Sequence, residues 1–245
     1  LILTNHLHRY AAAVVAKGDT AWRERWGDAV LHLYRDIANP QADALYPAHR
    51  HKDFFVGHSW ASGLFPSVSG RNQESSSESV NAYYGAALLG EALGDDRLRD
   101  FGRLLLATEI RSVWKYWQVE SDAIYPSVFA DGRVVTNVWS TKVDALTWFG
   151  SNVEFRFGIQ ILPVTPISEE LLRRSWLTLA ADKWATASST CTEQWRAFLL
   201  MAEALIDTEM AEKAWEAATK LTLFDNGNSK TNTLHFLATR GPPLP

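Results

Sequence analysis

The stretch "GRNQESSSESVNAYYGAALLGEALG", residues 70–94, decides the expected fold. Apolar and aromatic side chains recur in its second half at the three- and four-residue spacing of a helix, at Val80, Tyr83, Tyr84, Ala87 and Leu88. Gly94 ends the pattern, as glycine often ends a helix. The stretch therefore predicts a long helix over residues 73–93.

Further helices are predicted on both sides of this one. "RYAAAVVAKGD" is rich in Ala and ends at Gly18, and Asp19 is a candidate N-cap for a helix that Pro40 stops. Asp95 is a candidate N-cap for "DRLRDFGRLLLATEIRSVWKYW", and helical patterns return in "ISEELLRRSWLTLAADKWATAS", "CTEQWRAFLLMAEALI" and "DTEMAEKAWEAATKL". Antiparallel helix pairs without βαβ alternation predict an all-α fold in a single domain over residues 1–245.

Three regions interrupt the helices. Residues 39–71 carry Pro, Gly, Ser and His without a sustained period, which predicts a long ordered loop of a kind that often carries function. Residues 122–139 alternate weakly and contain Asp131-Gly132, a preferred pair for a tight turn, so a small β hairpin is expected there. "FDNGNSKTNTLHF" breaks the last helical pattern with Gly and Asn.

Composition excludes several classes of function. The chain has 245 residues, 47% of them hydrophobic, and a formal net charge of -4 without a basic run, so nucleic acid and an anionic membrane surface are not expected partners. No stretch approaches the roughly 20 apolar residues that span a bilayer. The single cysteine, Cys191, excludes an intramolecular disulfide and is expected to be a buried small apolar residue. Eleven tryptophans predict a heavily aromatic core, or rings presented to a flat ligand such as a sugar.

Two carboxylates stand at the start of the predicted helix. Glu74 and Glu78 are expected on one face, one turn apart, where the helix N-terminus favours their ionised forms. An ionised carboxylate beside the amides of Asn72 and Gln73 is suited to act as a general base for water. Ordinary helix-start electrostatics with a serine-rich cap explain the same pattern, and the spacing leaves both interpretations open.

The segment "HKDFFVGHSWASG" offers a competing chemistry. Phe54 to Val56 can form a short strand that leads into Gly57-His58-Ser59-Trp60-Ala61, a near match to the G-x-S-x-G elbow of serine hydrolases, with Ser59 as nucleophile. The elbow requires a helix after the serine, but Gly63 and Pro66 follow here.

Histidines of the same region suggest a metal site as another possibility. His49, His51 and His58, with Asp53, are residue types that bind metals. They lack the helical H-x-x-x-H spacing, and hydrogen bonding within a loop explains them equally well. No metal is expected.

Five segments, in this order and nearly from end to end, resemble glycoside hydrolase family 81, the endo-β-1,3-glucanases: "HKDFFVGHSWASGLF", "GRNQESSSESVNAYYGAALLG", "VWSTKVDALTWFG", "FGIQILPVTPISEELL" and "FDNGNSKTNTLHFLATR". The resemblance implies that the chain is most of an (α/α)6 toroid, the catalytic domain of the family. It also implies that a preceding β-sandwich and linker region are missing. Inverting cleavage of β-1,3-glucan is expected, without cofactor, by a monomer that is secreted or associated with the cell wall.

The resemblance also assigns catalytic roles. Glu74 is expected to be the base, and Glu78 to orient the base, the water or the sugar. The acid of the family is an Asp shortly before a Tyr-Ala-Ala-Ala helix; "LTNHLHRYAAAVV" matches the helix, but Asn5 stands where the Asp would fall, or the Asp lay before Leu1. An amide cannot supply the proton, so a non-catalytic glucan-binding domain is the alternative. Asp53 is a possible substitute acid, although ordering the loop or binding sugar is the preferred role.

The remaining candidates are expected to bind sugar around the base. Those that offer hydrogen bonds are His51, Asp53, His58, Asn72, Gln73, Asn81, Tyr84, Lys142 and Asp144. Those that offer rings for stacking are Trp60, Trp139 and Trp148. Capping and packing explain many such residues equally well, and Lys142 with Asp144 can simply form an ion pair of little net value.

Overall fold

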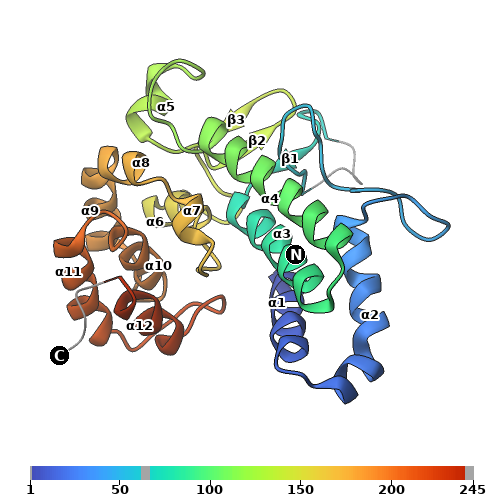
Figure 1. The fold of residues 1–245 in the computed structure, drawn as a ribbon. Coiled ribbons are helices and arrows are strands. Elements are labelled where there is room, and N and C mark those ends of the chain that lie inside the picture. The colour runs from blue at the N-terminus through green and yellow to red at the C-terminus, as the bar shows by residue number, and fades with distance from the viewer. Residues whose placement is uncertain (1, 62–66, 241–245) are drawn as a thin grey trace. The chain divides into compact units, whose positions relative to one another are not determined.

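Helices make up most of the structure. The computed structural model describes the backbone of residues 2–61 and 67–240, and the side chains of these residues from Arg9 onward. A small three-stranded sheet accompanies the helices, which confirms the predicted all-α class with a small β element (Figure 1). The chain divides into two compact units: the first unit comprises residues 1–61 and 78–112, and the second comprises residues 62–77 and 113–245. The toroid implied by the family stays a prediction.

The first unit contains α1 (Ile2–Ala16), α2 (Thr20–Ala38) and most of α3 (Ser76–Leu93) and α4 (Asp96–Tyr116). The predicted N-caps of α2 and α4 are confirmed. Asp19 caps α2 by accepting a hydrogen bond of 2.9 Å from Trp22 N, and Asp95 accepts one of 3.0 Å from Leu98 N at the start of α4. In the described part of the predicted long loop, a single antiparallel bridge joins Lys52 to Ser59.

Small residues let α3 and α4 approach closely in the core of the first unit. That core contains Tyr34 of α2 and Tyr83 and Leu89 of α3, all nearly inaccessible to solvent. A Cβ atom at Gly102 would lie 2.7 Å from the backbone nitrogen of Ala87. Only glycine fits there without a shift of one helix, so this contact fixes the spacing of the pair.

The sheet lies in the second unit and consists of β1 (Asn72–Gln73), β2 (Asn137–Trp139) and β3 (Val143–Asp144). The strands are antiparallel in the order β1-β2-β3, with Asn72 opposite Trp139 and Asn137 opposite Asp144. The strand that precedes Glu74 is therefore paired directly with β2, which carries Trp139.

The predicted position of the hairpin is wrong. Asp131 and Gly132 end the short helix α5 (Ser127–Gly132), and the hairpin is formed instead by β2 and β3. Arg133 adopts a left-handed conformation with φ of 63°, and its N–H bonds to the carbonyl groups of Phe129 and Ala130. The Asp-Gly pair thus lies at a helix C-terminus, where a left-handed residue commonly follows.

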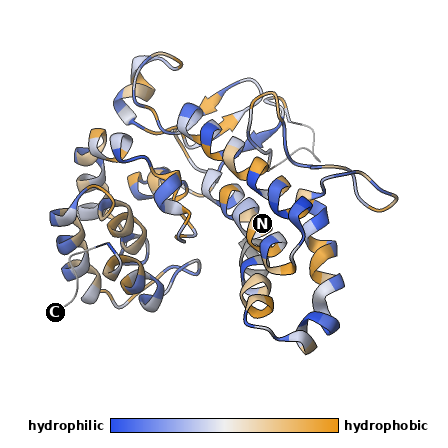
Figure 2. Ribbon diagram, in the orientation of Figure 1, coloured by the Kyte–Doolittle hydropathy of each residue, from blue (hydrophilic) through white to orange (hydrophobic). Residues whose placement is uncertain are grey.

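The described part of the second unit continues with α6 (Val153–Gly158), α7 (Ser168–Leu171), α8 (Arg174–Leu179), α9 (Ala181–Thr190), α10 (Glu193–Glu203), α11 (Thr208–Thr219) and α12 (Lys230–Ala238). The first long helical pattern of this region is broken into α7, α8 and α9. Helix α10 is buried from Ala197 to Glu203 and contacts α6, α9, α11 and α12. Figure 2 shows hydrophobic residues along the helices of both units.

Tryptophans lie both in the core and at the surface. Trp117, Trp176 and Trp184 are fully buried, whereas the side chain of Trp148 is 67% exposed. Cys191 departs from its expected burial: it is half-buried, and desolvation raises the pKa of its thiol to about 11. Among the described helices, none is both long and apolar enough to cross a membrane.

Candidate active site

Glu74 lies between a strand and a helix. The prediction that it shares the first turn of a helix with Glu78 is wrong, because Gln73 pairs with Val138 in the sheet and α3 begins only at Ser76. Glu78 does lie in the first turn of α3. Both glutamates are half-buried. The base candidate is therefore carried by the short link between β1 and α3.

Hydrogen bonds fix Glu74 at its backbone and at its carboxylate. Its carbonyl oxygen accepts a hydrogen bond of 2.8 Å from Nε2 of Gln160. One carboxylate oxygen, Oε2, accepts a hydrogen bond of 2.8 Å from the backbone N–H of Trp148. A hydrogen bond of this kind favours the ionised carboxylate that a base requires.

The three serines after Glu74 are buried and bond to the segment that follows α6. Ser75 Oγ donates to the carbonyl of Ile159 at 3.0 Å, and Ser77 Oγ donates to the same carbonyl at 3.2 Å. The backbone N–H of Ser76 donates to Oε1 of Gln160 at 3.2 Å. The serine cluster therefore anchors the start of α3, which is the structural role left open by the sequence.

An aromatic cluster lies beside the carboxylate of Glu74. The rings of Trp139 and Trp148 have centroids 5.3 Å apart, and the Trp148 ring is largely exposed. Trp139 Nε1 donates to Asp144 Oδ2 at 2.7 Å, while Lys142 Nζ lies 3.0 Å from the same oxygen. Lys142 and Asp144 thus form the ion pair expected as the alternative to sugar binding. Through Asp144, this pair also holds the indole N–H of Trp139.

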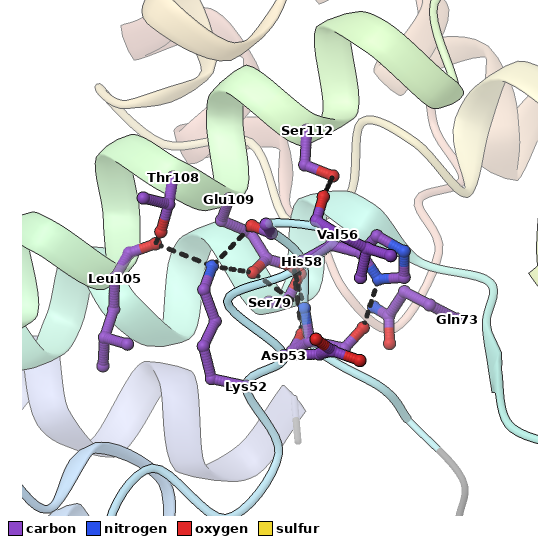
Figure 3. A network of polar contacts seen from close by, with 12 residues as sticks. Lys52, Asp53, Val56, His58, Gln73, Ser79, Leu105, Thr108, Glu109 and Ser112 are labelled. Atoms are coloured by element: carbon purple, nitrogen blue, oxygen red, sulfur yellow. Dashed lines mark hydrogen bonds and ion pairs between the residues drawn. The ribbon is translucent and has the colours of Figure 1, made fainter.

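A buried ion pair organises the loop of the first unit that contains the histidines (Figure 3). Lys52 Nζ lies 2.7 Å from Glu109 Oε2, and both side chains are inaccessible to solvent. Lys52 also donates to the carbonyl oxygens of Gly57, at 2.7 Å, and Leu105, at 3.2 Å. Burial lowers the pKa of Lys52, and the charge of Glu109 opposes that shift. The pair ties the loop to α4.

Glu109 also accepts hydrogen bonds from Ser59, the candidate nucleophile of the serine hydrolase alternative. The Ser59 hydroxyl donates to Glu109 Oε1 at 3.0 Å, its N–H donates to the same carboxylate, and Ser79 Oγ donates to Oε1 at 2.7 Å. Ser59 is 5% exposed, and the predicted strand at residues 54–56 is a turn. The Ser59 hydroxyl already donates to the carboxylate of the Lys52–Glu109 ion pair. The strand that the elbow requires before the serine is absent at residues 54–56. Gly63 and Pro66 lie outside the described residues.

Asp53, His58 and Trp60 contact one another within this loop. Asp53 accepts from Phe55 N at 3.0 Å and from Trp60 Nε1 at 3.2 Å. The His58 and Trp60 rings have centroids 4.5 Å apart and are nearly fully buried. Burial lowers the pKa of His58, and that of His51 as well. These contacts favour ordering of the loop as the role of Asp53, while sugar binding by the loop stays a prediction.

The histidines do not converge on a metal site. His49 packs edge-on against Phe54, with centroids 5.0 Å apart, whereas His58 Nδ1 lies 2.9 Å from the Ser59 carbonyl. Within residues 9–61 and 67–240, no three His, Cys, Asp or Glu side chains gather as ligands.

The other predicted residues are placed as follows. Asn72 and Gln73 are buried in β1, and Gln73 Nε2 donates to the Ser75 carbonyl at 2.8 Å. Asn81 is buried on α3, and Tyr84 is half-buried on the same helix. The side chain of Asn5 lies outside the described residues. Gln73 therefore supports the link that carries Glu74.

Residues 5–234 match the family described as "Glycosyl hydrolase family 81 C-terminal domain". The chain belongs to glycosyl hydrolase family 81. A glucan endo-1,3-beta-D-glucosidase of Glycine max is 36% identical over 245 residues, which are 94% of this chain and 36% of that protein. A protein of the same name from Thermobifida fusca is 35% identical, with 94% of this chain and 31% of that protein covered. The family 81 chain thus spans about a third of the length of these relatives.

Two further family 81 comparisons concern a septum enzyme and a solved structure. The primary septum glucan endo-1,3-beta-D-glucosidase of Schizosaccharomyces pombe is 31% identical over 94% of this chain and 23% of its own length. The glycoside hydrolase family 81 protein of Clostridium thermocellum, solved as a glutamate-to-alanine mutant, superposes with a TM-score of 0.85. It is 29% identical, and the match covers 96% of this chain and 33% of that one.

Sequence reasoning missed three buried polar residues of the family 81 chain, one in the second unit and two in the first. Gln160 lies in one of the five family-like segments, and its place between apolar neighbours is a signal for a buried amide. Lys52 and Glu109 are 57 positions apart, and neither has a local pattern that predicts their pairing. Gln160 thus holds the candidate Glu74 in the second unit, and Lys52 with Glu109 holds the histidine loop in the first.

Proposed function

We propose that this family 81 chain hydrolyses internal bonds of β-1,3-glucan with inversion, using Glu74 as the general base. The observation that carries the proposal is the hydrogen bond of 2.8 Å from Trp148 N to Glu74 Oε2, beside the exposed Trp148 ring. A held carboxylate next to a flat apolar surface combines a base with a surface on which a glucose unit can stack. The relatives are glucan endo-1,3-beta-D-glucosidases, which supports β-1,3-glucan as the substrate.

In the proposed reaction, Glu74 takes a proton from a water molecule. The water oxygen attacks the anomeric carbon from the face opposite the leaving group, and the carbon–oxygen bond to the leaving sugar breaks. A carboxylic acid across the bond protonates the leaving oxygen, and in inverting enzymes the two groups stand roughly 6.5 to 9.5 Å apart to admit the water. Glu78 is assigned to orient the base, the water or the sugar. Two carboxyl groups suffice, so no cofactor is proposed.

The substrate surface is assigned to the aromatic cluster. Trp148 presents most of its ring, while Trp139 is fixed by its hydrogen bond to Asp144. A glucose ring has apolar faces of C–H groups that pack on such rings. Because the polymer cannot enter cells, we propose a secreted or cell-wall-associated monomer, and the septum enzyme among the relatives supports this location.

A non-catalytic glucan-binding domain is the second candidate function. The observation that favours it concerns the substitute acid: both carboxylate oxygens of Asp53 accept N–H groups within its own loop. A carboxylate used in this way is a poor proton donor. The same surface would then bind glucan without cleaving it.

The test is hydrolysis of soluble β-1,3-glucan by this chain, with the anomeric configuration followed by NMR. Release of α-anomers, lost in Glu74→Gln while glucan binding persists, is the expected result. The glutamine can still accept the Trp148 N–H, so only the base is removed. Binding without any release would instead support the glucan-binding domain. Equal activity of the wild type and Glu74→Gln would overturn the role of Glu74, and Ser59→Ala would then test the serine hydrolase alternative.

A further inference from the structure

The side chain of Gln160 uses both ends of its amide in the second unit. It is 2% exposed and lies two residues after α6. Its Nε2 donates to the carbonyl of Glu74 at 2.8 Å and to that of Thr136 at 3.0 Å. Its Oε1 accepts from the backbone N–H of Ser76 at 3.2 Å and from the Ser76 hydroxyl. One planar group therefore connects three backbone positions.

These three positions belong to separate parts of the candidate site. Glu74 carries the proposed base, Ser76 begins α3, and Thr136 directly precedes β2. Thr136 is itself fixed, because its N–H donates to the Asp144 carbonyl at 2.9 Å. The amide of Gln160 thus links the backbone of the base to the sheet that carries Trp139.

We propose that Gln160 is a positioning residue that sets the location of the Glu74 carboxylate for catalysis. The proposal rests on the proposed function of Glu74. Trp148 N–H holds the carboxylate end of Glu74, and Gln160 holds its backbone end, so the side chain is restrained at both ends. A displacement of about 1 Å at a reacting group can reduce a rate by about 100-fold. Because Gln160 is 2% exposed, its side chain is covered by protein and offers almost no surface to a sugar.

An amide is required because both donors and acceptors are used. A glutamate at residue 160 has the same shape and can accept from Ser76, but its carboxylate cannot donate to the carbonyl groups of Glu74 and Thr136. It would place a negative charge against two carbonyl oxygens. Gln160→Glu therefore releases the backbone of Glu74 with the least change of volume.

Gln118 offers a matched control in the same unit. It is 3% exposed, and its Nε2 donates to the Leu171 carbonyl at 2.7 Å, away from the contacts of Glu74. Gln118→Glu removes a buried amide donor in the same chemical way. It measures the general effect of such a change on a folded chain.

The experiment measures kcat, KM and the pH profile on a soluble β-1,3-glucan oligosaccharide. We expect Gln160→Glu to lower kcat by at least about 30-fold, to leave KM within about threefold, and to shift the acidic limb of the profile, which reports the general base. Gln118→Glu is expected to leave kcat, KM and the profile near the wild-type values. Thermal unfolding confirms that each variant is folded. If Gln160→Glu does not fold, Gln160→Asn, which keeps the amide but shortens its reach, replaces it with the same expectation.

Different results overturn the inference and the proposed function. An active wild type with an inactive Glu74→Gln but an unchanged Gln160 variant overturns only the role of Gln160. An equal fall of kcat in the Gln118 variant, or parallel changes of kcat and KM in the Gln160 variant, also overturns it, because both indicate a general structural effect. A wild type that releases no sugar, or a fully active Glu74→Gln, overturns the proposed function and the inference with it.

Discussion

The backbone N–H of Trp148 donates a hydrogen bond of 2.8 Å to the carboxylate of Glu74, while Trp148 itself is 67% exposed. One residue thus carries both the proposed stacking surface and the N–H that holds the proposed base. The two tasks use different atoms, so they can be separated by mutation.

Replacement of Trp148 by alanine removes the ring and keeps the N–H. We expect KM for β-1,3-glucan oligosaccharides to rise roughly 5- to 20-fold, because the stacking surface is lost, with no shift in the pH profile. Trp26→Ala is the control, since Trp26 is 44% exposed on α2 and outside the candidate site. A shifted profile in Trp148→Ala would contradict the separation of tasks.

The buried pair of Lys52 and Glu109 predicts a large loss of stability when one partner is removed. Glu109→Gln leaves the Lys52 ammonium buried without a counter-charge, so the free energy of unfolding in urea should fall by about 3 to 5 kcal/mol. Replacing both by apolar residues, in Lys52→Met with Glu109→Leu, should cost less than the sum of the single changes.

The control for this pair is the exposed ion pair of Arg50 and Asp36, whose atoms lie 2.6 Å apart. Asp36→Asn is expected to change stability by less than about 1 kcal/mol, because solvent screens the interaction. If Glu109→Gln were equally mild, Lys52 would not depend on Glu109 for its charge.

The burial of Glu203 should make the free energy of unfolding depend on pH. It is 6% exposed, and desolvation raises its pKa from 4.5 to about 7. Between these values the folded chain binds more protons than the unfolded one, so this contribution is full below about pH 4.5 and is lost as the pH rises through 7. Glu203→Gln should therefore be more stable than the wild type at pH 8, by on the order of 2 kcal/mol, and similar to it at pH 4.5.

The measurement is urea unfolding of both proteins from pH 4.5 to 8. Glu212→Gln, at an exposed position on α11, is expected to leave the pH dependence unchanged. Parallel curves for the wild type and Glu203→Gln would show that Glu203 ionises without penalty.

Two helical glycines should respond to alanine in opposite directions. Gly102→Ala forces a Cβ to within 2.7 Å of Ala87 N, so α3 and α4 must move apart, at a cost of about 1 to 3 kcal/mol. Gly27→Ala in α2 meets only Arg23 Cγ, at 3.8 Å, and should stabilise the helix by about 0.5 to 1 kcal/mol. Thermal unfolding distinguishes the two, and a stabilised Gly102→Ala would exclude the close packing of the pair.

Local signals predicted the helix ends because their causes are local. Asp19 and Asp95 each bond to an N–H three positions later, within the reach of a single turn. Asp131-Gly132 led to a wrong position for the hairpin because the same pair suits both a hairpin turn and a helix end. The helix that precedes it decides between them, and its pattern spans only residues 127–132.

The start of α3 could not be predicted from its own residues. Glu74 has good helical neighbours on its C-terminal side, but β2 pairs with Gln73 and Gln160 bonds to Glu74, from 86 positions away in the latter case. The candidates Glu74, Trp139 and Trp148 could be chosen by chemistry and family resemblance. The fixation of Glu74 could not, because Gln160 acts only through contacts that folding creates, and the pairing of Lys52 with Glu109 in the histidine loop is equally long-range.

The serines that follow Glu74 fix the alignment of this segment with the chain after α6. Ser75, Ser76 and Ser77 each bond to residues 159–162, through directional hydrogen bonds rather than apolar contacts that tolerate sliding. A slip of one residue in either direction would bring Glu74 or Glu78 to a position where a serine hydroxyl now donates, and an ionised carboxylate cannot donate. Residues 75–77 can therefore align with residues 159–162 in one register only, and this register sets the position of Glu74 along the chain.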